Sequence, residues 1–527
     1  MNNKTIKNVG IILGCSIAAK VLSYFWEALI AAYLGASDQA DALYMVTSIF
    51  GILYPILDLG IWKVFLPIYK TKLVEDNESK AERIANVAVT LFFTLSAALV
   101  LFLLVCAKPL VSIIAPGFDA EKQSMTVQYL RISAPTYLLM AVASVVGAML
   151  QSREKFLGSQ IREIGTHVSK IIFIFICFRF LGIYAAVIAM IVGSIFRLLV
   201  QLPFINWKWK FRPDFHFGDE DVVPMLKGLP SVAVTAAIAH INGLVDRTIA
   251  SGAASGSVAC LNYGHKLVNV FSGMVSTAIS TAVYPTMIQY IAEKKTDKLN
   301  TLLTKVITAL GFIIIPLSCF CALFSKELVT VAFQRGAFDA AATELTAGVF
   351  MGYCIGMLFV GVSTVVTNVF YGFGDTKLTM YISIVQIVLN VGMNLLLIRV
   401  WGVAGLAYAT SAAAIICLCI RLFFLKKYLK VDYRAIIKEN LKILGLSLVS
   451  CAIPFVAMRY LLHLNPYLTL IISVCAAAGV YFVLAYICRI DTLHFLKDMV
   501  MKRLGKGKAN EEEDIEKNDG TDNTDHR

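Results

Sequence analysis

Several charged side chains of this sequence lie inside long apolar stretches. Lys20 and Glu27 lie in the first stretch, and His265 and Lys266 lie in the eighth. A charge at the centre of a membrane-spanning helix costs at least about 2.5–3.5 kcal/mol, so it is expected to face a cavity or a partner. An ammonium group removed from water makes charge-assisted hydrogen bonds to phosphate oxygens. The pattern predicts that Lys20 and Lys266 hold an anionic group, such as a diphosphate, in a shared cavity.

The alternative is that each lysine pairs with a nearby acid. Lys20 and Glu27 are seven residues apart, which is about two helical turns and a long reach for a side chain. Asp41 is expected at the outer membrane surface, where it could contact the substrate or cap the helix that begins there. Glu27, Asp41 and His265 therefore join the two lysines as candidate substrate-binding residues.

Two further pairs of ionisable residues lie in apolar stretches. Asp58 and Lys63 lie in the inner half of the second stretch and could form a gate pair or extend to the membrane surface. His167 and Lys170 are three residues apart, hence on one helical face, and are expected to line the cavity.

A second polar set lies near the predicted outer side in the second half of the chain. Asp246 lies near the end of the seventh stretch, Asn390 and Asn394 share one helical face, and Thr410 lies at a similar depth. One carboxylate, two amides and a hydroxyl are hard oxygen ligands that suit an alkali cation. Interhelical hydrogen bonding is the alternative role of such residues in membranes. The set predicts either a sodium site or hydrogen bonds between helices.

The composition shows which class of protein positions these charges. The residues AVILMFWYC make up 58% of the 527 residues, DEKR only 16%, and mean hydropathy is +0.74. Soluble domains carry roughly 25% charged residues, so the composition predicts a polytopic membrane protein. No P-loop GxxxxGK(S/T) occurs, which argues against ATP hydrolysis, and the twelve cysteines lack the spacing of a zinc or redox site.

The apolar stretches predict fourteen membrane-spanning helices, because crossing about 30 Å of hydrocarbon takes around 20 residues. Their approximate limits are 9–34, 41–68, 85–112, 127–150, 160–179, 183–205, 224–250, 257–289, 300–324, 345–371, 378–399, 404–425, 443–462 and 467–488. Lysine and arginine gather in alternate loops, which predicts that both termini are cytoplasmic. The formal charge of +12 then reflects this topology and attraction to anionic membrane lipids, and not a nucleic-acid site.

An internal repeat of about 220 residues divides the chain. Residues 141–146 (AVASVV) resemble 361–366 (GVSTVV), and 179–187 (RFLGIYAAV) resemble 399–407 (RVWGVAGLA). The predicted fold is all-α, with two parallel six-helix lobes and two extra helices. The predicted parts are lobes at 1–215 and 216–430, helices 13 and 14 within 431–490, and an amphipathic helix followed by a disordered acidic cytoplasmic tail at 491–527. Two such lobes suit alternating access, in which a central cavity opens to each side in turn.

Six short segments of the chain carry a further signal: Ala19-Lys-Val-Leu-Ser-Tyr, the Ala-Asp-Ala around Asp41, Leu66-Pro67, Leu261-Asn-Tyr, Gly374-Asp-Thr-Lys and Gly405-Leu-Ala-Tyr-Ala-Thr. Together they resemble the MurJ family of lipid II flippases. The resemblance covers nearly the whole chain, including spans 13 and 14. It implies membership of the multidrug/oligosaccharidyl-lipid/polysaccharide exporter superfamily.

The resemblance implies a transporter, not an enzyme, that moves lipid II from the inner to the outer leaflet of a bacterial cytoplasmic membrane. Lipid II is the undecaprenyl-diphosphate-linked precursor of peptidoglycan. Lys20 and Lys266 match family arginines that hold the diphosphate, and Glu27 and Asp41 match acidic positions. The second polar set falls on family sodium ligands, with Asn394 in place of an acid, so sodium would be the coupling ion. Cell-wall synthesis proteins are the further partners that this role implies.

The sequence departs from the family pattern at several cavity positions. Trp26 aligns with a further arginine, and an expected arginine pair falls around Leu53 and Tyr54. Lysine lacks the bidentate fork of arginine, so another undecaprenyl-linked polysaccharide precursor is the alternative cargo.

Three less favoured functions stay open. A cation-coupled drug exporter would have twelve spans, and a transport-inactive scaffold would recruit cell-wall proteins through the acidic tail. A membrane-embedded glycan polymerase would need a large outer loop with catalytic acids, and the longest one here, about 325–344, has some twenty residues.

Overall fold

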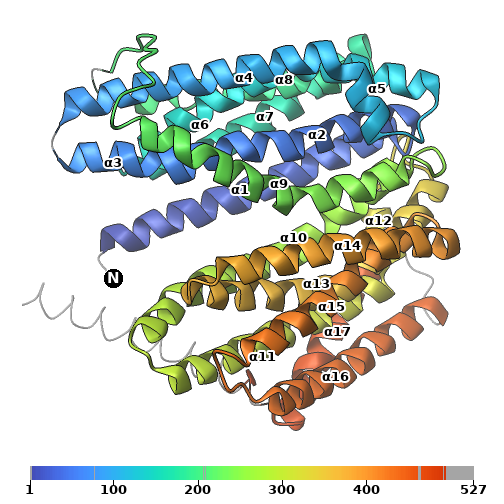
Figure 1. Cartoon of the computed structure of the whole chain (residues 1–527). Coiled ribbons are helices and arrows are strands. Elements are labelled where there is room, and N and C mark those ends of the chain that lie inside the picture. The colour runs from blue at the N-terminus through green and yellow to red at the C-terminus, as the bar shows by residue number, and fades with distance from the viewer. Residues whose placement is uncertain are drawn as a thin grey trace, which may run out of the picture. The chain divides into compact units, whose positions relative to one another are not determined.

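The computed structural model describes residues 3–75, 77–205, 207, 209–460, 465–490 and 492–493, and every regular element in these ranges is a helix (Figure 1). The elements before residue 222 are α1 (Asn3–Leu34), α2 (Asp38–Gly60), the π-helix η1 (Ile61–Phe65), α3 (Leu66–Val74), α4 (Glu78–Ile114), α5 (Ala120–Ser133), α6 (Thr136–Ser152), α7 (Phe156–Leu181), α8 (Ile183–Leu199) and the 3-10 helix η2 (Leu202–Phe204). The later ones are α9 (Val223–Ala250), α10 (Ser257–Ala292), α11 (Thr296–Leu323), α12 (Ser325–Phe333), α13 (Ala340–Gly372), α14 (Thr376–Trp401), α15 (Ala404–Leu425), α16 (Tyr433–Tyr460) and α17 (Pro466–Ile487). The predicted all-α fold is confirmed.

The number of spans also agrees with the prediction. Twelve helical segments of the described chain are long and apolar enough to cross a membrane, or up to fourteen if two bent helix pairs each count as one span. α5 and α6 meet at 40°, and α9 bends by 43° between Ile238 and His240. The first bend follows from Pro135, because proline has no N–H with which to continue the helix.

The outer loop predicted at 325–344 is shorter in the structure. The stretch at 325–344, predicted as a loop, contains the short helix α12, so only residues 334–339 connect it to α13. The predicted amphipathic helix and acidic tail lie outside the described residues, except for 492–493.

By its internal contacts the chain forms two compact units. The first comprises Met1–Met274, Ser325–Gly356 and Thr376–Ile420, and the second comprises Val275–Phe324, Met357–Asp375 and Arg421–Arg527. These bounds follow contacts and not the repeat, so the predicted lobes at 1–215 and 216–430 stay a prediction.

In the first unit, small residues bring α13 and α15 close together. A Cβ added at Gly352 would lie 2.9 Å from the Cβ of Ala407, and one at Gly356 would lie 2.6 Å from Ser411 Oγ. Ser411 Oγ also donates to the Gly352 carbonyl at 2.7 Å. Close backbone approach of this kind stabilises helix pairs in membranes, where lipid is as apolar as the side chains.

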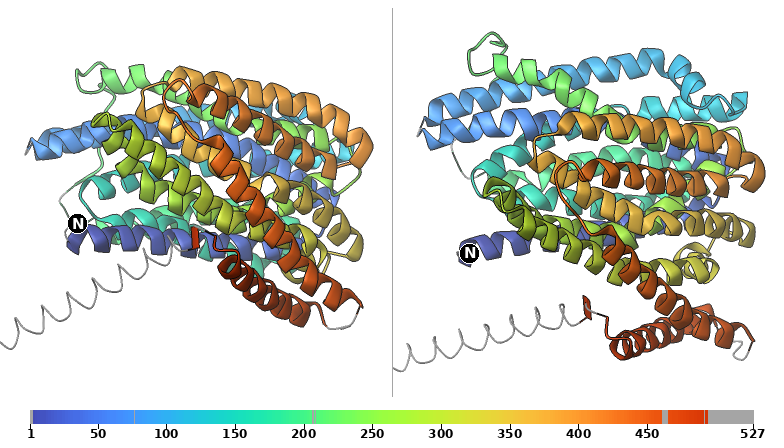
Figure 2. Two further views of the ribbon diagram at one scale, coloured as in Figure 1. Left: turned by 90° about the horizontal axis from the view of Figure 1, so that it is seen from below. Right: turned by 60° about the horizontal axis from the view of Figure 1, so that its bottom comes forward.

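In the second unit, α11 packs against α16, which packs against α17, the dark red helix of Figure 2. Pro316 lies inside α11 and leaves the carbonyl of Phe312 without its helical N–H donor. Tyr481 of α17 replaces that donor, with its hydroxyl 2.9 Å from the Phe312 carbonyl. The proline break therefore creates the acceptor that fixes α17 to α11.

Candidate functional site

The carboxylate of Glu27 is the centre of a polar cluster in the first unit. Its Oε2 accepts hydrogen bonds from Tyr44 Oη at 2.7 Å and from Asn262 Nδ2 at 3.4 Å. Its Oε1 lies 3.2 Å from Lys266 Nζ. Glu27 is buried, whereas the Lys266 side chain is 42% exposed. The pair therefore joins a fixed acid to a lysine that remains accessible.

Three helices position this cluster. Glu27 comes from α1 and Tyr44 from α2, while Asn262 and Lys266 are four residues apart on one face of α10. The ring of Tyr44 meets that of Tyr263 edge to face, with 5.2 Å between centroids. Because residues on α1 and α10 must meet, the cluster exists only when these helices are in contact.

Three other predicted cavity residues do not contact Glu27 and have surroundings of their own. Lys20 is exposed on α1 and has no ion pair within the described chain, so the alternative Lys20–Glu27 pair is not formed. Lys170 of α7 lies over the ring of Trp26, with its Nζ 4.0 Å from the centroid. His265 is exposed, contacts Asn269 at 3.2 Å, and has its ring 5.4 Å from that of Tyr353.

Asp41 has a different role from the predicted cap of its own helix. Ser37 caps α2, since its Oγ accepts the N–H of Ala40 at 3.2 Å. Asp41, only 1% exposed, accepts the N–H groups of Gly256 and Ala259, each at 2.8 Å, and thereby caps α10. A carboxylate at this place also interacts favourably with the positive end of the helix dipole.

A lysine completes this arrangement, which we call the Asp41 latch (Asp41, Lys122 and the first turn of α10). Lys122 of α5 lies 3.2 Å from Asp41 Oδ2 and also pairs with Asp38. Gly256 has φ of +81°, a left-handed conformation that glycine adopts without strain. The latch connects α2, α5 and α10 at the end of the helices predicted to face outward.

Further contacts close the same end of the first unit. The N–H of Ala337 donates to the Ala32 carbonyl at 2.8 Å, and Tyr24 Oη donates to the Ala332 carbonyl at 3.2 Å. Tyr263 Oη donates to the Gly35 carbonyl at 3.1 Å. Thus α1 is bound to α10, to α12 and to the turn after α12.

Asp58 does not form the predicted gate pair with Lys63. Its Oδ1 accepts hydrogen bonds from Tyr54 Oη at 2.8 Å and Trp62 Nε1 at 3.2 Å, and from Ser144. Arg162 Nη1 lies 3.9 Å from the same oxygen. Lys63 is exposed and has no ion pair among the described residues.

Two arginines of this network are interior residues, which the sequence alone did not indicate. Arg197 of α8 makes two contacts with Glu163 of α7, at 2.9 and 2.5 Å, and donates to Tyr54 at 3.0 Å. Arg162 and Arg197 are both buried. Each lies near the end of a span, where sequence alone suggests a side chain that extends to the membrane surface. The one feature of the sequence that could have indicated an interior ion pair is the acid directly after Arg162.

The second polar set does come together. Asp246 of α9 accepts from Asn394 Nδ2 at 2.6 Å and from Thr410 Oγ1 at 3.1 Å. Asn390 donates to Thr410 at 3.0 Å and accepts from Asn394 at 3.0 Å. Asn390 and Asn394 are fully buried, and Asn394 Oδ1 has no hydrogen-bond partner within the described chain. An orphaned oxygen beside a carboxylate fits a cation ligand set, and the direct hydrogen bonds fit the alternative.

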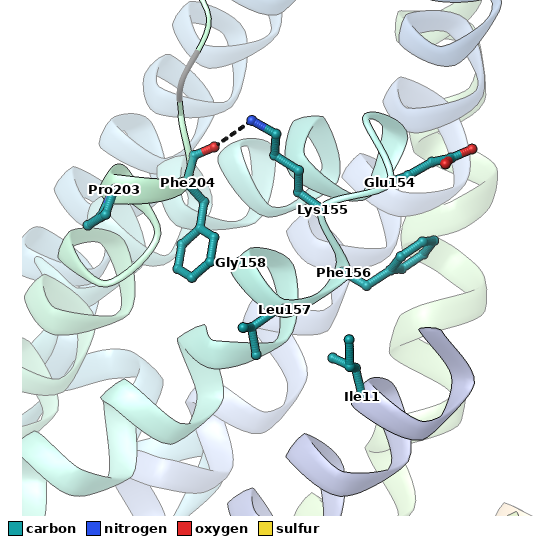
Figure 3. Close-up of a pocket in the computed structure, with 8 residues that line it drawn as sticks. All are labelled: Ile11, Glu154, Lys155, Phe156, Leu157, Gly158, Pro203 and Phe204. Atoms are coloured by element: carbon teal, nitrogen blue, oxygen red, sulfur yellow. Dashed lines mark hydrogen bonds between the residues drawn. The ribbon is translucent and has the colours of Figure 1, made fainter. Parts of the chain in front are cut away.

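A separate pocket of about 330 Å³ lies between the first part of α1, the α6–α7 turn and η2 (Figure 3). Its walls are mostly apolar, with Ile11, Leu157 and Phe204 facing it, and Lys155 Nζ donates to the Phe204 carbonyl at 2.9 Å. Burial and the neighbouring Arg153 lower the pKa of Lys155. None of the predicted site residues lines this pocket.

The sequence of the chain matches a known protein family. Residues 30–477 match the family described as lipid II flippase MurJ. The chain belongs to the MurJ family. The probable lipid II flippase MurJ of Buchnera aphidicola subsp. Baizongia pistaciae is 24% identical over 486 residues, which are 89% of this chain and 94% of that protein. The probable lipid II flippase MurJ of Rickettsia prowazekii is 23% identical over 504 residues, or 92% and 98%.

Solved structures agree on the fold of a MurJ family member. A lipid II flippase MurJ in an inward closed conformation has a TM-score of 0.78 at 21% identity, covering 91% of this chain and 99% of that one. An inward-facing multidrug resistance MATE family transporter has a TM-score of 0.67 at 14% identity, covering 79% and 97%. The chain is therefore a multi-pass membrane transporter, and the resemblance found in the sequence is confirmed.

Proposed function

We propose that this chain translocates lipid II from the inner to the outer leaflet by alternating access. Its MurJ family membership over residues 30–477 supports this cargo. Lipid II is built on an undecaprenyl diphosphate, so its transport needs cations that meet the diphosphate inside the membrane. No covalent chemistry is required.

The Glu27–Lys266 pair is the observation that carries the proposal at the level of residues. The exposed lysine can exchange its contact with Glu27 for one with a diphosphate oxygen. Glu27 then keeps the hydrogen bonds from Tyr44 and Asn262, which reduce the cost of leaving a buried carboxylate without its counter-ion. Lys20, exposed two turns away on α1, would supply a second cation.

The Asp41 latch would control access from the outer side. While Asp41 caps α10, the outer ends of α2 and α10 stay joined, so release to the outer leaflet requires these hydrogen bonds to break. His265 would add a hydrogen-bonding group beside Lys266 on the exposed side of α10.

Sodium is proposed as the coupling ion. Asp246, Asn390, Asn394 and Thr410 would hold it with one carboxylate, two amide oxygens and one hydroxyl. The orphaned Oδ1 of Asn394 supports this proposal. This oxygen accepts no hydrogen bond among the described residues, so rotation of the amide could turn it toward the ion without loss of an accepted hydrogen bond.

The orientation is also a proposal. The lysine and arginine bias puts both termini in the cytoplasm of a bacterium. Membrane lipids surround the spans, and cell-wall synthesis proteins would act on the cargo after its translocation.

A related cargo is the second candidate, because lysines stand where the family has arginines. A diphosphate bound by ammonium groups loses the bidentate geometry of guanidinium. The same cations would accept another undecaprenyl-diphosphate-linked glycan, such as a capsule precursor.

The deciding experiment is depletion of a conditional MurJ in a bacterial host that carries this gene in trans. We expect restored growth and lipid II that becomes accessible on the outer face. Lys20→Ala and Lys266→Ala should each abolish rescue at normal membrane abundance, whereas Lys326→Ala, an exposed lysine on α12, is the matched control. Failure of the wild-type chain together with restored capsule export would favour the second cargo, and full activity of both lysine variants would contradict the diphosphate role.

A further inference from the structure

The segment between η2 and α9, residues 205–222, has an unusual alternation. It contains five aromatic residues, Trp207, Trp209, Phe211, Phe215 and Phe217. Basic residues lie between them, with proline and aspartate added only between Phe211 and Phe215. The segment joins the end of one predicted span to the start of the next, so both of its ends lie at the same membrane face. Figure 1 shows it as the green loop beside the ends of α3 and α4.

The segment is bound to α4 of the same unit. Trp209 Nε1 donates to Asn86 Oδ1 at 3.0 Å, and the N–H of Asp214 donates to Thr90 Oγ1 at 3.1 Å, both on α4. Trp207, Trp209 and Phe217 pack against the buried apolar cluster of the first unit. The segment is therefore held on α4, although its described residues form no long helix.

Three of its four acids contact cations of α3 and α4. Arg83 of α4 lies 3.5 Å from Asp214 and 3.1 Å from Asp219, and Lys72 of α3 lies 3.0 Å from Asp221. Although partial burial acts in the opposite direction, hydrogen bonds from His216 lower the pKa of Asp214. Of the four acids in the segment, three are thus paired with cations of the first unit, and Glu220 is exposed.

The exposed side chains of the segment include two cations and two aromatic rings. Lys210 and Arg212 are exposed, and neither has an ion pair or side-chain hydrogen bond within the described chain. Phe211 is 48% exposed and Phe215 is 65% exposed. Exposed rings next to unpaired cations suit the boundary between lipid headgroups and acyl chains, where rings enter the apolar edge and cations meet phosphate.

We infer that residues 209–217 form a membrane-surface anchor that binds the anionic phospholipids of the adjacent leaflet. Lys210 and Arg212 contact the headgroup phosphates, and Phe211 and Phe215 insert at the headgroup level. The pairing of three acids with Arg83 and Lys72 makes this possible, because among the exposed side chains the charges of Lys210 and Arg212 then exceed the single charge of Glu220. The inference concerns bulk lipid and does not depend on which glycan is transported.

The test uses the full-length protein in nanodiscs, with p-benzoylphenylalanine in place of Phe211 or, separately, Phe215. Ultraviolet light then crosslinks the ring to whatever lies against it, and mass spectrometry identifies the adduct. Phosphatidylcholine alone is compared with a mixture of phosphatidylcholine and phosphatidylglycerol. Because each cation near an anionic surface strengthens binding about fivefold, we expect several-fold more lipid adduct in the anionic nanodiscs and a decrease at high salt.

Two controls separate the anchor from general proximity to the membrane. The double variant Lys210→Gln with Arg212→Gln should lose the dependence on phosphatidylglycerol, while Lys326→Gln removes a lysine elsewhere and should keep it. The same probe at Phe217, which packs on the first unit, should give few lipid adducts. Equal lipid adducts in both lipid compositions, or adducts only with residues of this protein, would overturn the inference, whether or not the chain rescues a MurJ-depleted host.

Discussion

Replacing Asp41 by asparagine tests whether the latch at the end of α10 keeps that end closed. The carboxylate accepts two backbone N–H groups of α10 and one contact from Lys122. Asparagine keeps one acceptor oxygen, but its NH₂ group faces a second donor, and its side chain carries no charge for Lys122. Because Lys122 still has Asp38 as a partner, the lysine itself remains paired.

The size of the effect follows from these contacts. Loss of a helix-capping bond costs about 1 kcal/mol, and loss of a hydrogen bond to a charged group costs about 1.5–3 kcal/mol. The retained oxygen and the retained Asp38 reduce the total, and about 2 kcal/mol is the expected net cost. Since about 1.4 kcal/mol corresponds to a factor of ten, Asp41→Asn should shift the equilibrium about 30-fold toward the open end.

Cys260 reports this opening directly. It lies on α10 one residue after Ala259 and is fully buried. Maleimide labelling can be measured on the tryptic peptide 248–266, in which Cys260 is the only cysteine. We expect labelling about 30-fold faster in Asp41→Asn than in the wild type, because a closed end protects the thiol.

Two comparisons make the labelling result specific. Asp38→Asn removes an acid that is 46% exposed and that accepts no backbone N–H group of α10. This variant should therefore change the labelling rate little. Cys354, also buried, should stay protected if the rest of the unit is folded. Equal labelling of Cys260 in the wild type and in Asp41→Asn would refute the reasoning, since the latch would then contribute nothing to closure.

Three further predictions concern the remaining polar contacts. Lys266→Arg should keep rescue of a MurJ-depleted host, since guanidinium also binds diphosphate, and loss of rescue by this variant alone would contradict a simple charge role. Asp246→Ala should remove the sodium dependence of transport in proteoliposomes, and an unchanged sodium response would exclude the ion site. Tyr481→Phe should lower the free energy of unfolding by about 1 kcal/mol, because the carbonyl of Phe312 loses its donor. Thermal unfolding in detergent measures this, with Tyr486→Phe, which removes the hydroxyl of an exposed tyrosine on the same helix, as the control.

The spans could be predicted because their signal is local. Each needs about 20 apolar residues in one stretch, and nothing distant in the chain alters that requirement. Even the bend before α6 has a local cause in Pro135. The clustering of Asp246 with Asn390, Asn394 and Thr410 could also be anticipated, because depth within a span can be counted from its ends.

The role of Asp41 could not be predicted in the same way. Its position near the start of α2 suggests a cap for that helix, and sequence spacing supports this. The N–H groups that it accepts belong to Gly256 and Ala259, more than two hundred residues later. Only the packing of α2 against α10 makes them neighbours, and no pattern within either segment carries that information.

The buried arginines form an interior network that the charge bias of the loops did not indicate. Arg162 and Arg197 lie near span ends, where a cation normally indicates the cytoplasmic side. Both are buried, and through Glu163, Tyr54 and Asp58 they bind α2, α7 and α8 to one another. Separating α7 from α8 would break both contacts of Arg197 with Glu163 at once and leave a buried guanidinium without its counter-ion. Within the first unit, the helices joined by these arginines should therefore move together, and the contacts that exchange during transport should be those at Asp41 and Glu27.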